Sequence, residues 1–204
     1  MYGAHLDALD DLARTIVLRG KHSAGILQGD SRKHKANYWM DKSSGEIGDL
    51  LFFHKHMKGG YKQALNNYMD TYFCIHTRSA TRGAVTNENA HPFEFSNLVG
   101  MHNGTLSSSI FDPDPGKTDS EKMFELMNEQ GIESVLRRMT DNDAYAIVVF
   151  DKKTQEIVIA RNKNRTLYYT ICTKNNVMFY ASESWMLHGI LHRNGLAHLK
   201  VYSF

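Results

Sequence analysis

Four short β-rich segments follow one another in the second half of the chain, and they constrain its fold more than any other feature. They are rich in β-branched and aromatic residues, and turn-forming residues separate them. Such runs, interrupted by turn signals, are typical of antiparallel strands. The predicted strands are Ala144–Asp151, Glu156–Ala160, Leu167–Thr173 and Val177–Ala181. Two earlier apolar runs, at residues 72–76 and 97–101, predict further buried strands.

Helical patterns lie around these strands. Leu6, Leu9, Leu12 and Ile16 repeat at helical spacing, which predicts a helix that ends near the Arg-Gly pair at residues 19 and 20. Residues 29 to 60 are rich in Lys, His, Gly and Ser, and we interpret them as a hairpin or loops around the strand-like Leu50–Phe53.

A second helix is predicted to begin after Thr118, because Glu121 follows three residues later as in a capping box. Another helix is predicted over Ile132–Met139. Helices and strands do not alternate strictly, so the pattern favours an α+β fold with two antiparallel sheets and flanking helices. The length of 204 residues suits a single domain, and no internal repeat or linker divides it.

The composition excludes several classes of protein. The formal net charge is +2, from 24 Lys and Arg against 22 Asp and Glu, so no strong field attracts a nucleic acid. No apolar run approaches the roughly 18 residues that a membrane helix needs, and the N-terminal residues lack a signal-peptide pattern. Cys74 and Cys172 are too few for a disulfide framework. We therefore expect a cytoplasmic protein with no nucleic acid partner and no membrane partner.

Three polar motifs are too specific to serve the scaffold alone. The first, at residues 19–25, reads RGKHSAG. The second, at residues 76–83, reads HTRSATRG and continues into NAHP at residues 89–92. The third is His102-Asn103-Gly104, and Asp119 follows it within Thr118–Glu121.

Taken together and in this order, these motifs resemble the class II glutamine amidotransferases, a family of N-terminal-nucleophile hydrolases. Asp143–Ala146 and Ala181–Glu183 agree, so the resemblance covers the chain from about residue 12 to 190. The residues around Asn87–Leu106, together with His22, are most similar to the stand-alone versions found in bacteriophages. The resemblance implies a four-layer αββα sandwich, with two antiparallel sheets face to face and helices outside.

The resemblance also implies a role for each motif in binding L-glutamine. Arg78 would hold the α-carboxylate through two hydrogen bonds from its planar guanidinium, which a Lys side chain does not match. Asp119 would pair with the α-ammonium group. The side-chain amide of Asn103 and the backbone N–H of Gly104 would form an oxyanion hole, which stabilises the negative oxygen of a tetrahedral intermediate.

Thr81 and Arg82 fall where the family sets main-chain groups against the substrate. Many relatives have His at position 82 and a bulky aromatic residue at position 79, where this chain has Arg82 and Ser79. These departures are compatible with glutamine recognition, but they leave open whether a lid closes over the site.

Each of these residues also has a structural interpretation. Arg78 at a strand end suits a surface salt bridge. Asp119 in the first turn of a helix interacts favourably with the helix dipole. Asn103-Gly104 is a common turn dipeptide. The surrounding motifs favour the functional interpretation in each case.

The nucleophile of the family is a cysteine at the mature N-terminus, whose free amine acts as the general base. This sequence begins Met1-Tyr2-Gly3. Either the true start lies upstream and the strand with the cysteine is absent, or the chain is a shortened, inactive relative. Cys74 and Cys172 are expected to be buried hydrophobes rather than substitutes. We expect residues 1–204 to form one amidotransferase-like domain that lacks its first strand and does not turn over glutamine as written.

Two functions stay open. One is hydrolysis of the glutamine amide, with ammonia delivered to an unknown acceptor by a plain glutaminase or with a synthase or acceptor-binding partner subunit. The other is a non-catalytic module that senses glutamine or binds a partner. No cofactor is expected. No metal is expected either, because no set of His, Cys and carboxylate residues has zinc-like spacing, and His54 and His56 are interpreted as solvated.

Overall fold

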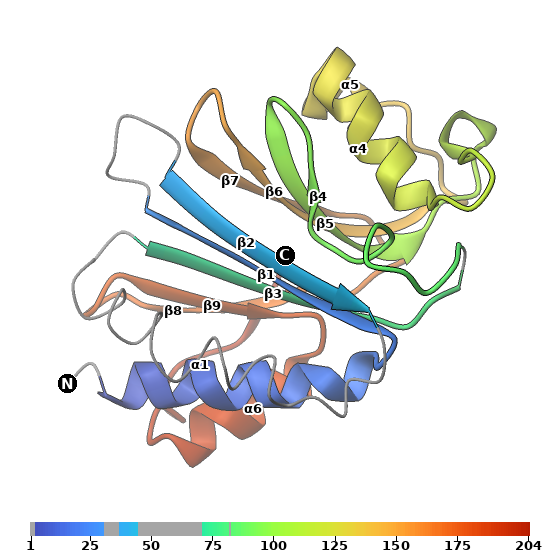
Figure 1. Cartoon of the computed structure of the whole chain (residues 1–204). Helices are drawn as coiled ribbons and strands as arrows, with labels where there is room; N and C mark the ends of the chain where they lie inside the picture. The colour runs from blue at the N-terminus through green and yellow to red at the C-terminus, as the bar shows by residue number, and fades with distance from the viewer. Residues whose placement is uncertain (1–2, 31–36, 45–70, 82) are drawn as a thin grey trace.

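The computed structural model describes residues 3–30, 37–44, 71–81 and 83–204. Its helices and strands form four layers (Figure 1). One outer layer contains α4 (Asp119–Gln130) and α5 (Ile132–Leu136), and the other contains α1 (Gly3–Thr15) and α6 (Ser184–Arg193). Antiparallel sheets lie between these helices. The predicted αββα sandwich is therefore confirmed, and none of the described helices has the length and apolarity to cross a membrane.

One inner layer is a single sheet with the order β4-β5-β6-β7, which we call the continuous sheet. Its strands are β4 (Phe93–Glu94), β5 (Leu98–Thr105), β6 (Ala144–Asp151) and β7 (Glu156–Arg161). The outer face of this sheet packs against α4, where Met123, Phe124 and Met127 are buried. A short 3₁₀ helix, Ser109–Phe111, follows β5.

The other inner layer consists of two three-stranded sheets, β2-β1-β3 and β10-β8-β9, which we call the split layer. Its strands are β1 (Ser23–Asp30), β2 (Asn37–Ser44), β3 (Thr71–Arg78), β8 (Tyr168–Cys172), β9 (Val177–Ala181) and β10 (Tyr202–Ser203). Among the described residues, β3 and β9 are sheet edges, and Tyr180 of β9 hydrogen bonds to Cys74 of β3. Within the described residues, the second of the two predicted β layers thus consists of two sheets, divided between β3 and β9.

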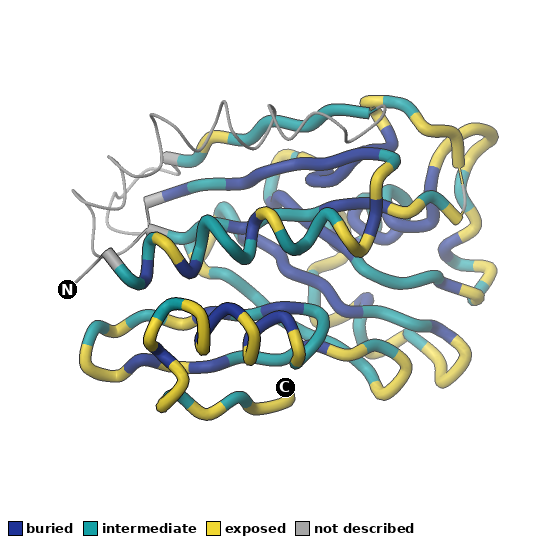
Figure 2. Tube along the Cα trace, turned by 90° about the horizontal axis from the view of Figure 1, so that it is seen from below, coloured by how far each residue is buried: buried dark blue, intermediate teal, exposed yellow. Residues whose placement is uncertain are grey.

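Besides the cluster under α4, the core has parts on both sides of the split layer. Between the two inner layers, Leu27 and Cys74 of the split layer pack against Val99, Met101 and Phe150 of the continuous sheet. On the other side, α1 and α6 cover the split layer through a second buried cluster. Figure 2 shows the resulting pattern, with buried strands inside and exposed positions along the outer helices.

Several predicted elements match the structure, with differences at their ends. The Thr118 hydroxyl accepts a hydrogen bond from the backbone N–H of Glu121 at 3.1 Å, as predicted. The Glu121 carboxylate bonds to Lys117 instead of completing the capping box. α5 ends at Leu136, before the predicted Met139, and Leu50–Phe53 lie outside the described residues. β1, which no sequence pattern predicted, pairs in antiparallel fashion with β2.

Candidate active site

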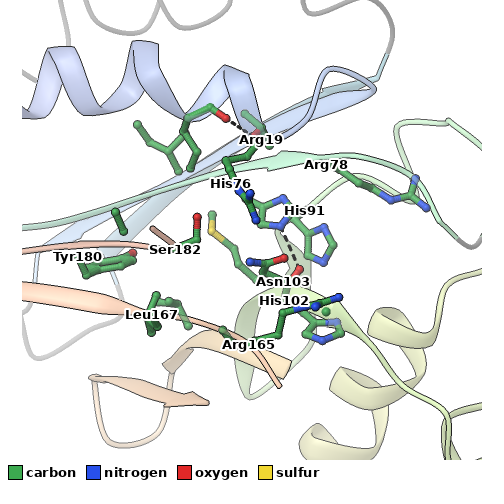
Figure 3. A pocket seen from close by; sticks show the side chains of 18 of the residues that line it. Arg19, His76, Arg78, His91, His102, Asn103, Arg165, Leu167, Tyr180 and Ser182 are labelled. Atoms are coloured by element: carbon green, nitrogen blue, oxygen red, sulfur yellow. Dashed lines mark hydrogen bonds between the residues drawn. The ribbon is translucent and has the colours of Figure 1, made fainter. Parts of the chain in front are cut away.

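A cavity of about 380 Å³ lies where the split layer divides. Its walls come from the edges β3 and β9, from β5 and β6 of the continuous sheet, and from α1. Apolar side chains such as Leu12 and Val148 line it. Polar side chains also line it, and Figure 3 shows His76, His91 and Asn103 gathered together. The cavity receives residues from all three motifs that the sequence analysis singled out.

Arg78 ends β3 and is buried, with 7% of its surface exposed. The N–H of His22 donates to the carbonyl of Arg78 at 3.0 Å, and a Cβ at Gly20 would lie 2.3 Å from the Arg78 carbonyl carbon. Only glycine therefore fits at position 20, which explains the Arg-Gly motif as a support for the end of β3. The Arg78 guanidinium donates to the carbonyl of Ala84 at 3.1 Å. Burial lowers the pKa of Arg78, and the nearby charge of Asp119 offsets part of that effect.

Asp119 is the first residue of α4 and is also buried. Its carboxylate accepts hydrogen bonds from the N–H groups of Leu106 at 2.8 Å and Ser120 at 2.9 Å. These bonds fix the carboxylate at the cavity wall, next to a helix N-terminus that favours negative charge. The functional and structural interpretations of Asp119 are thus compatible.

Asn103 and Gly104 lie within strand β5, opposite Ala146 and Tyr145 of β6. The turn interpretation of this dipeptide is therefore wrong. A Cβ at Gly104 would lie 1.8 Å from the carbonyl oxygen of Ala144, so the close approach of β5 to β6 requires glycine there. Both residues line the cavity, and Figure 3 shows the Asn103 side chain in it.

Three histidines surround Asn103. The rings of His76 and His91 are tilted by 38° with their centroids 4.1 Å apart, and His76 Nε2 lies 3.0 Å from the carbonyl oxygen of His102. His102 Nδ1 lies 2.8 Å from the hydroxyl of Ser120. Burial lowers the pKa of His76 to about 4 and also lowers the pKa values of His91 and His102. All three are therefore neutral at pH 7, and His76 must donate from Nε2 to the carbonyl.

Comparisons with known proteins bear on this arrangement. A family model described as a glutamine amidotransferase domain matches residues 112–189, which include Asp119 and the strands β6 to β9. The chain is similar to class II glutamine amidotransferases. Two curated relatives are glutamine–fructose-6-phosphate aminotransferases (isomerizing).

The relative from Buchnera aphidicola subsp. Acyrthosiphon pisum is 29% identical over 197 residues, which cover 86% of this chain and 29% of the relative. The relative from Thermotoga maritima is 30% identical over 192 residues, which cover 82% of this chain and 28% of the relative. The chain thus spans less than a third of the length of these curated relatives.

Two solved structures share the fold. The glutamine phosphoribosylpyrophosphate amidotransferase of B. subtilis superposes with a TM-score of 0.60 at 19% identity and covers 98% of this chain and 41% of its own. A structure described as the allosteric regulatory enzyme of purine biosynthesis gives a TM-score of 0.64 at 18% identity, with 99% and 42% covered. At these identities the likeness establishes the fold alone.

Thr81 and Arg82 of the second motif were also predicted to lie against the substrate. Thr81 lines the cavity, and the neighbouring loop is held by His22, whose Nδ1 accepts from the N–H of Ala80 at 2.8 Å. Arg82 lies outside the described residues. Ser182 and Arg165 also line the cavity, and no sequence motif predicts a role for either side chain.

Neither cysteine of this amidotransferase-like chain reaches the cavity. Cys74 and Cys172 are both buried, as predicted, and neither lines the cavity walls. Burial raises the pKa of the Cys74 thiol to about 11, so the reactive thiolate is scarce at pH 7. Within the described part of the chain, no group of three His, Cys, Asp or Glu residues has the geometry to hold a metal ion.

Proposed function

We propose that the cavity binds L-glutamine and that the protein takes part in hydrolysis of the glutamine side-chain amide. The observation that carries this proposal is one cavity lined by Arg78, Asp119, Asn103 and Gly104, which come from three separate segments. A buried cation, a buried anion and a pair of hydrogen-bond donors complement a free amino acid with a polar side chain. The similarity to glutamine amidotransferases supports the same substrate.

In the proposed complex, the Arg78 guanidinium binds the α-carboxylate and the Asp119 carboxylate binds the α-ammonium group. The Asn103 amide and the Gly104 N–H then face the oxygen of the substrate amide, on which negative charge develops when a nucleophile adds to the carbon. In the overall reaction, water and L-glutamine give L-glutamate and ammonium. The C–N bond breaks, and the oxygen of water ends in the γ-carboxylate.

We propose that an extended segment adds between β3 and β9 and brings the nucleophile, so that residues 1–204 form the rest of a single domain. Two sheet edges that are unpaired in the described part of the chain face the same cavity. Apolar walls from α1 and from β6 lie on either side of the gap, and alternate side chains of a strand would contact both. Asn103 lines the same space, within reach of a residue on such a strand.

A second candidate is a glutamine-binding module without catalytic activity. It is favoured by the burial of Cys74 and Cys172 away from the cavity. The two candidates share the binding residues and differ in the nucleophile. Delivery of ammonia to an acceptor, by way of a synthase or acceptor-binding partner, stays a prediction. So do a cytoplasmic location and the finer likeness to bacteriophage proteins.

Three measurements on the protein from its native source separate these candidates. Calorimetry measures binding of L-glutamine, with D-glutamine as the control ligand and Arg78→Ala as the control variant. A coupled assay measures ammonium release, and intact mass reports a covalent adduct of the glutamine analogue diazo-oxo-norleucine. Binding with an adduct and ammonium supports the hydrolase. Binding without either supports the module, and the absence of binding contradicts both.

A further inference from the structure

Arg165 lies in the loop between β7 and β8, and the proposed function gives it no role. The loop is held firmly in place. The N–H of Arg165 donates to the carbonyl of Asn162 at 3.2 Å, and its own carbonyl accepts from Arg161 Nη1 at 3.2 Å. The side-chain amides of Asn162 and Asn164 both donate to the carbonyl of Asp143, at 2.6 and 2.9 Å. Arg165 therefore starts from a fixed backbone and lines the cavity.

The Arg165 guanidinium has few partners. Its Nε is buried without a hydrogen-bond partner in the described structure, and Nη1 donates to the carbonyl of Asn164 at a long 3.3 Å. Among the described residues, no carboxylate forms a salt bridge with it. The nearby Arg161 shows the usual alternative, because its guanidinium donates to the carbonyls of Phe204, Asn162 and Arg165. The Arg165 side chain is partly buried, and its unused donors leave it able to bind an anion in the cavity.

The position of Arg165 indicates which end of a bound amino acid it would contact. The positive charge of Arg165 acts on the His102 ring, which adjoins Gly104 because a Cβ at Gly104 would lie 2.5 Å from His102 Nε2. Figure 3 shows Arg165 close to His102 and Asn103, whereas Arg78 lies apart from them at the end of β3. The two arginines thus line different parts of the cavity, and Arg165 lies at the side of the oxyanion donors.

We propose that Arg165 contacts the side-chain end of the bound amino acid and provides a positive charge for the γ-carboxylate of L-glutamate. This inference rests on the proposed function, because it assigns the two ends of the same ligand. Arg78 then binds the α-carboxylate, which substrate and product share. Arg165 distinguishes them, since its charge favours an anionic oxygen over a neutral amide.

The test measures the Kd values of L-glutamine and L-glutamate by calorimetry on the full chain. Arg165→Gln removes the charge and keeps a polar side chain, whereas Arg165→Lys keeps the charge. Arg138→Gln is a matched control in the exposed turn that follows α5, where Arg138 bonds to Gln130. We expect Arg165→Gln to weaken glutamate binding by roughly 10- to 100-fold, the effect of one charge-assisted hydrogen bond. Glutamine binding should change by less than about threefold, because its amide is neutral.

The outcomes separate this inference from the proposed function. If the wild-type protein binds neither amino acid, the proposed function fails first. If the wild-type protein binds both and Arg165→Gln weakens both equally, Arg165 faces the shared α-carboxylate or supports the fold, and the inference is wrong. Unchanged binding of both also overturns it. Arg165→Lys should recover part of the glutamate affinity, and a failure to do so together with a lowered Tm would indicate a structural role.

Discussion

The two inner layers of this protein differ in how their strands are joined, and the candidate site uses that difference. The continuous sheet pairs β4 to β7 without interruption and buries its outer face under α4. The split layer divides between β3 and β9, and the cavity lies at this division. One layer is therefore closed, and the other provides room for a ligand.

The polar groups of the site are distributed in the same way. Asn103, Gly104 and Asp119 belong to the continuous sheet and the helix on its outer face, where packing fixes their positions. Arg78 and Thr81 belong to the edge of the split layer. Groups that stabilise charge developing in a transition state need fixed positions. Groups that bind the charged ends of a ligand can lie at the less constrained edge of a sheet. The comparison predicts that changes in the continuous sheet affect stability and chemistry more than equivalent changes at the split.

The largest difference should appear when one phenylalanine is removed from each layer. Phe124 is fully buried between α4 and the continuous sheet, whereas Phe73 on β3 is half-buried and lines the cavity. We expect Phe124→Ala to lower the free energy of unfolding by about 3 to 5 kcal/mol, because a packed core does not fill the hole. Phe73→Ala should cost about 1 kcal/mol, since its surroundings already contain empty space. Urea denaturation measures both, and equal losses would contradict the comparison.

Loss of an oxyanion donor should have the next largest effect. In a preparation that hydrolyses glutamine, Asn103→Ala should lower kcat by about 10²- to 10³-fold, with KM nearly unchanged. The reason is that the Asn103 amide would act on charge that forms during the reaction rather than on the bound substrate. Steady-state ammonium release measures both constants. A rise in KM at constant kcat would instead assign Asn103 to ground-state binding.

Lowering the pH should reduce the free energy of unfolding through the histidine cluster, to which both inner layers contribute. His76 comes from β3 of the split layer and His102 from β5 of the continuous sheet. Burial lowers the pKa of His76 from 6.5 to about 4, so the folded state takes up its proton later than the unfolded state. Above pH 6.5 both states are neutral, and the group does not affect stability. As the pH falls from 6.5 to 4, the unfolded state is favoured by up to about 3 kcal/mol.

Urea denaturation between pH 7 and pH 4 measures this slope. His76→Gln should reduce the slope, with His91 and His102 providing the rest, whereas His188→Gln, at an exposed position on α6, should leave it unchanged. A His76→Gln variant with the wild-type slope would place the acid sensitivity in other groups.

Much of the fold could be predicted from the sequence because its signals are local. β6 and β9 have the predicted bounds, since each apolar run ends at a turn signal. The start of α4 was predicted from Thr118 and Glu121, which interact with each other in the structure. β1 was missed because Ser23, Gly25 and Gly29 are weak strand formers, and pairing with β2 and β3 overrides that preference.

The site was partly predictable for a similar reason. Arg78, Asp119 and Asn103 occur in motifs that resemble a known family, and all three line one cavity. Arg165 carries no such signal, because its local sequence is that of an ordinary turn. The position of its loop depends on bonds from Asn162 and Asn164 to the distant Asp143, which no local pattern reveals.

The smallest predicted effect concerns the N-cap of α4. This helix packs on the continuous sheet and begins with the site residue Asp119. The Thr118 hydroxyl caps the helix that begins with Asp119. Thr118→Ala should lower the free energy of unfolding by about 1 kcal/mol, and Thr118→Ser should keep most of it because the hydroxyl remains. The Asp119 carboxylate keeps its bonds from Leu106 and Ser120 in both variants, so glutamine affinity should change less than stability does. Urea denaturation and calorimetry measure the two quantities. A loss of affinity larger than the loss of stability would mean that the cap, rather than the backbone around β5, positions Asp119.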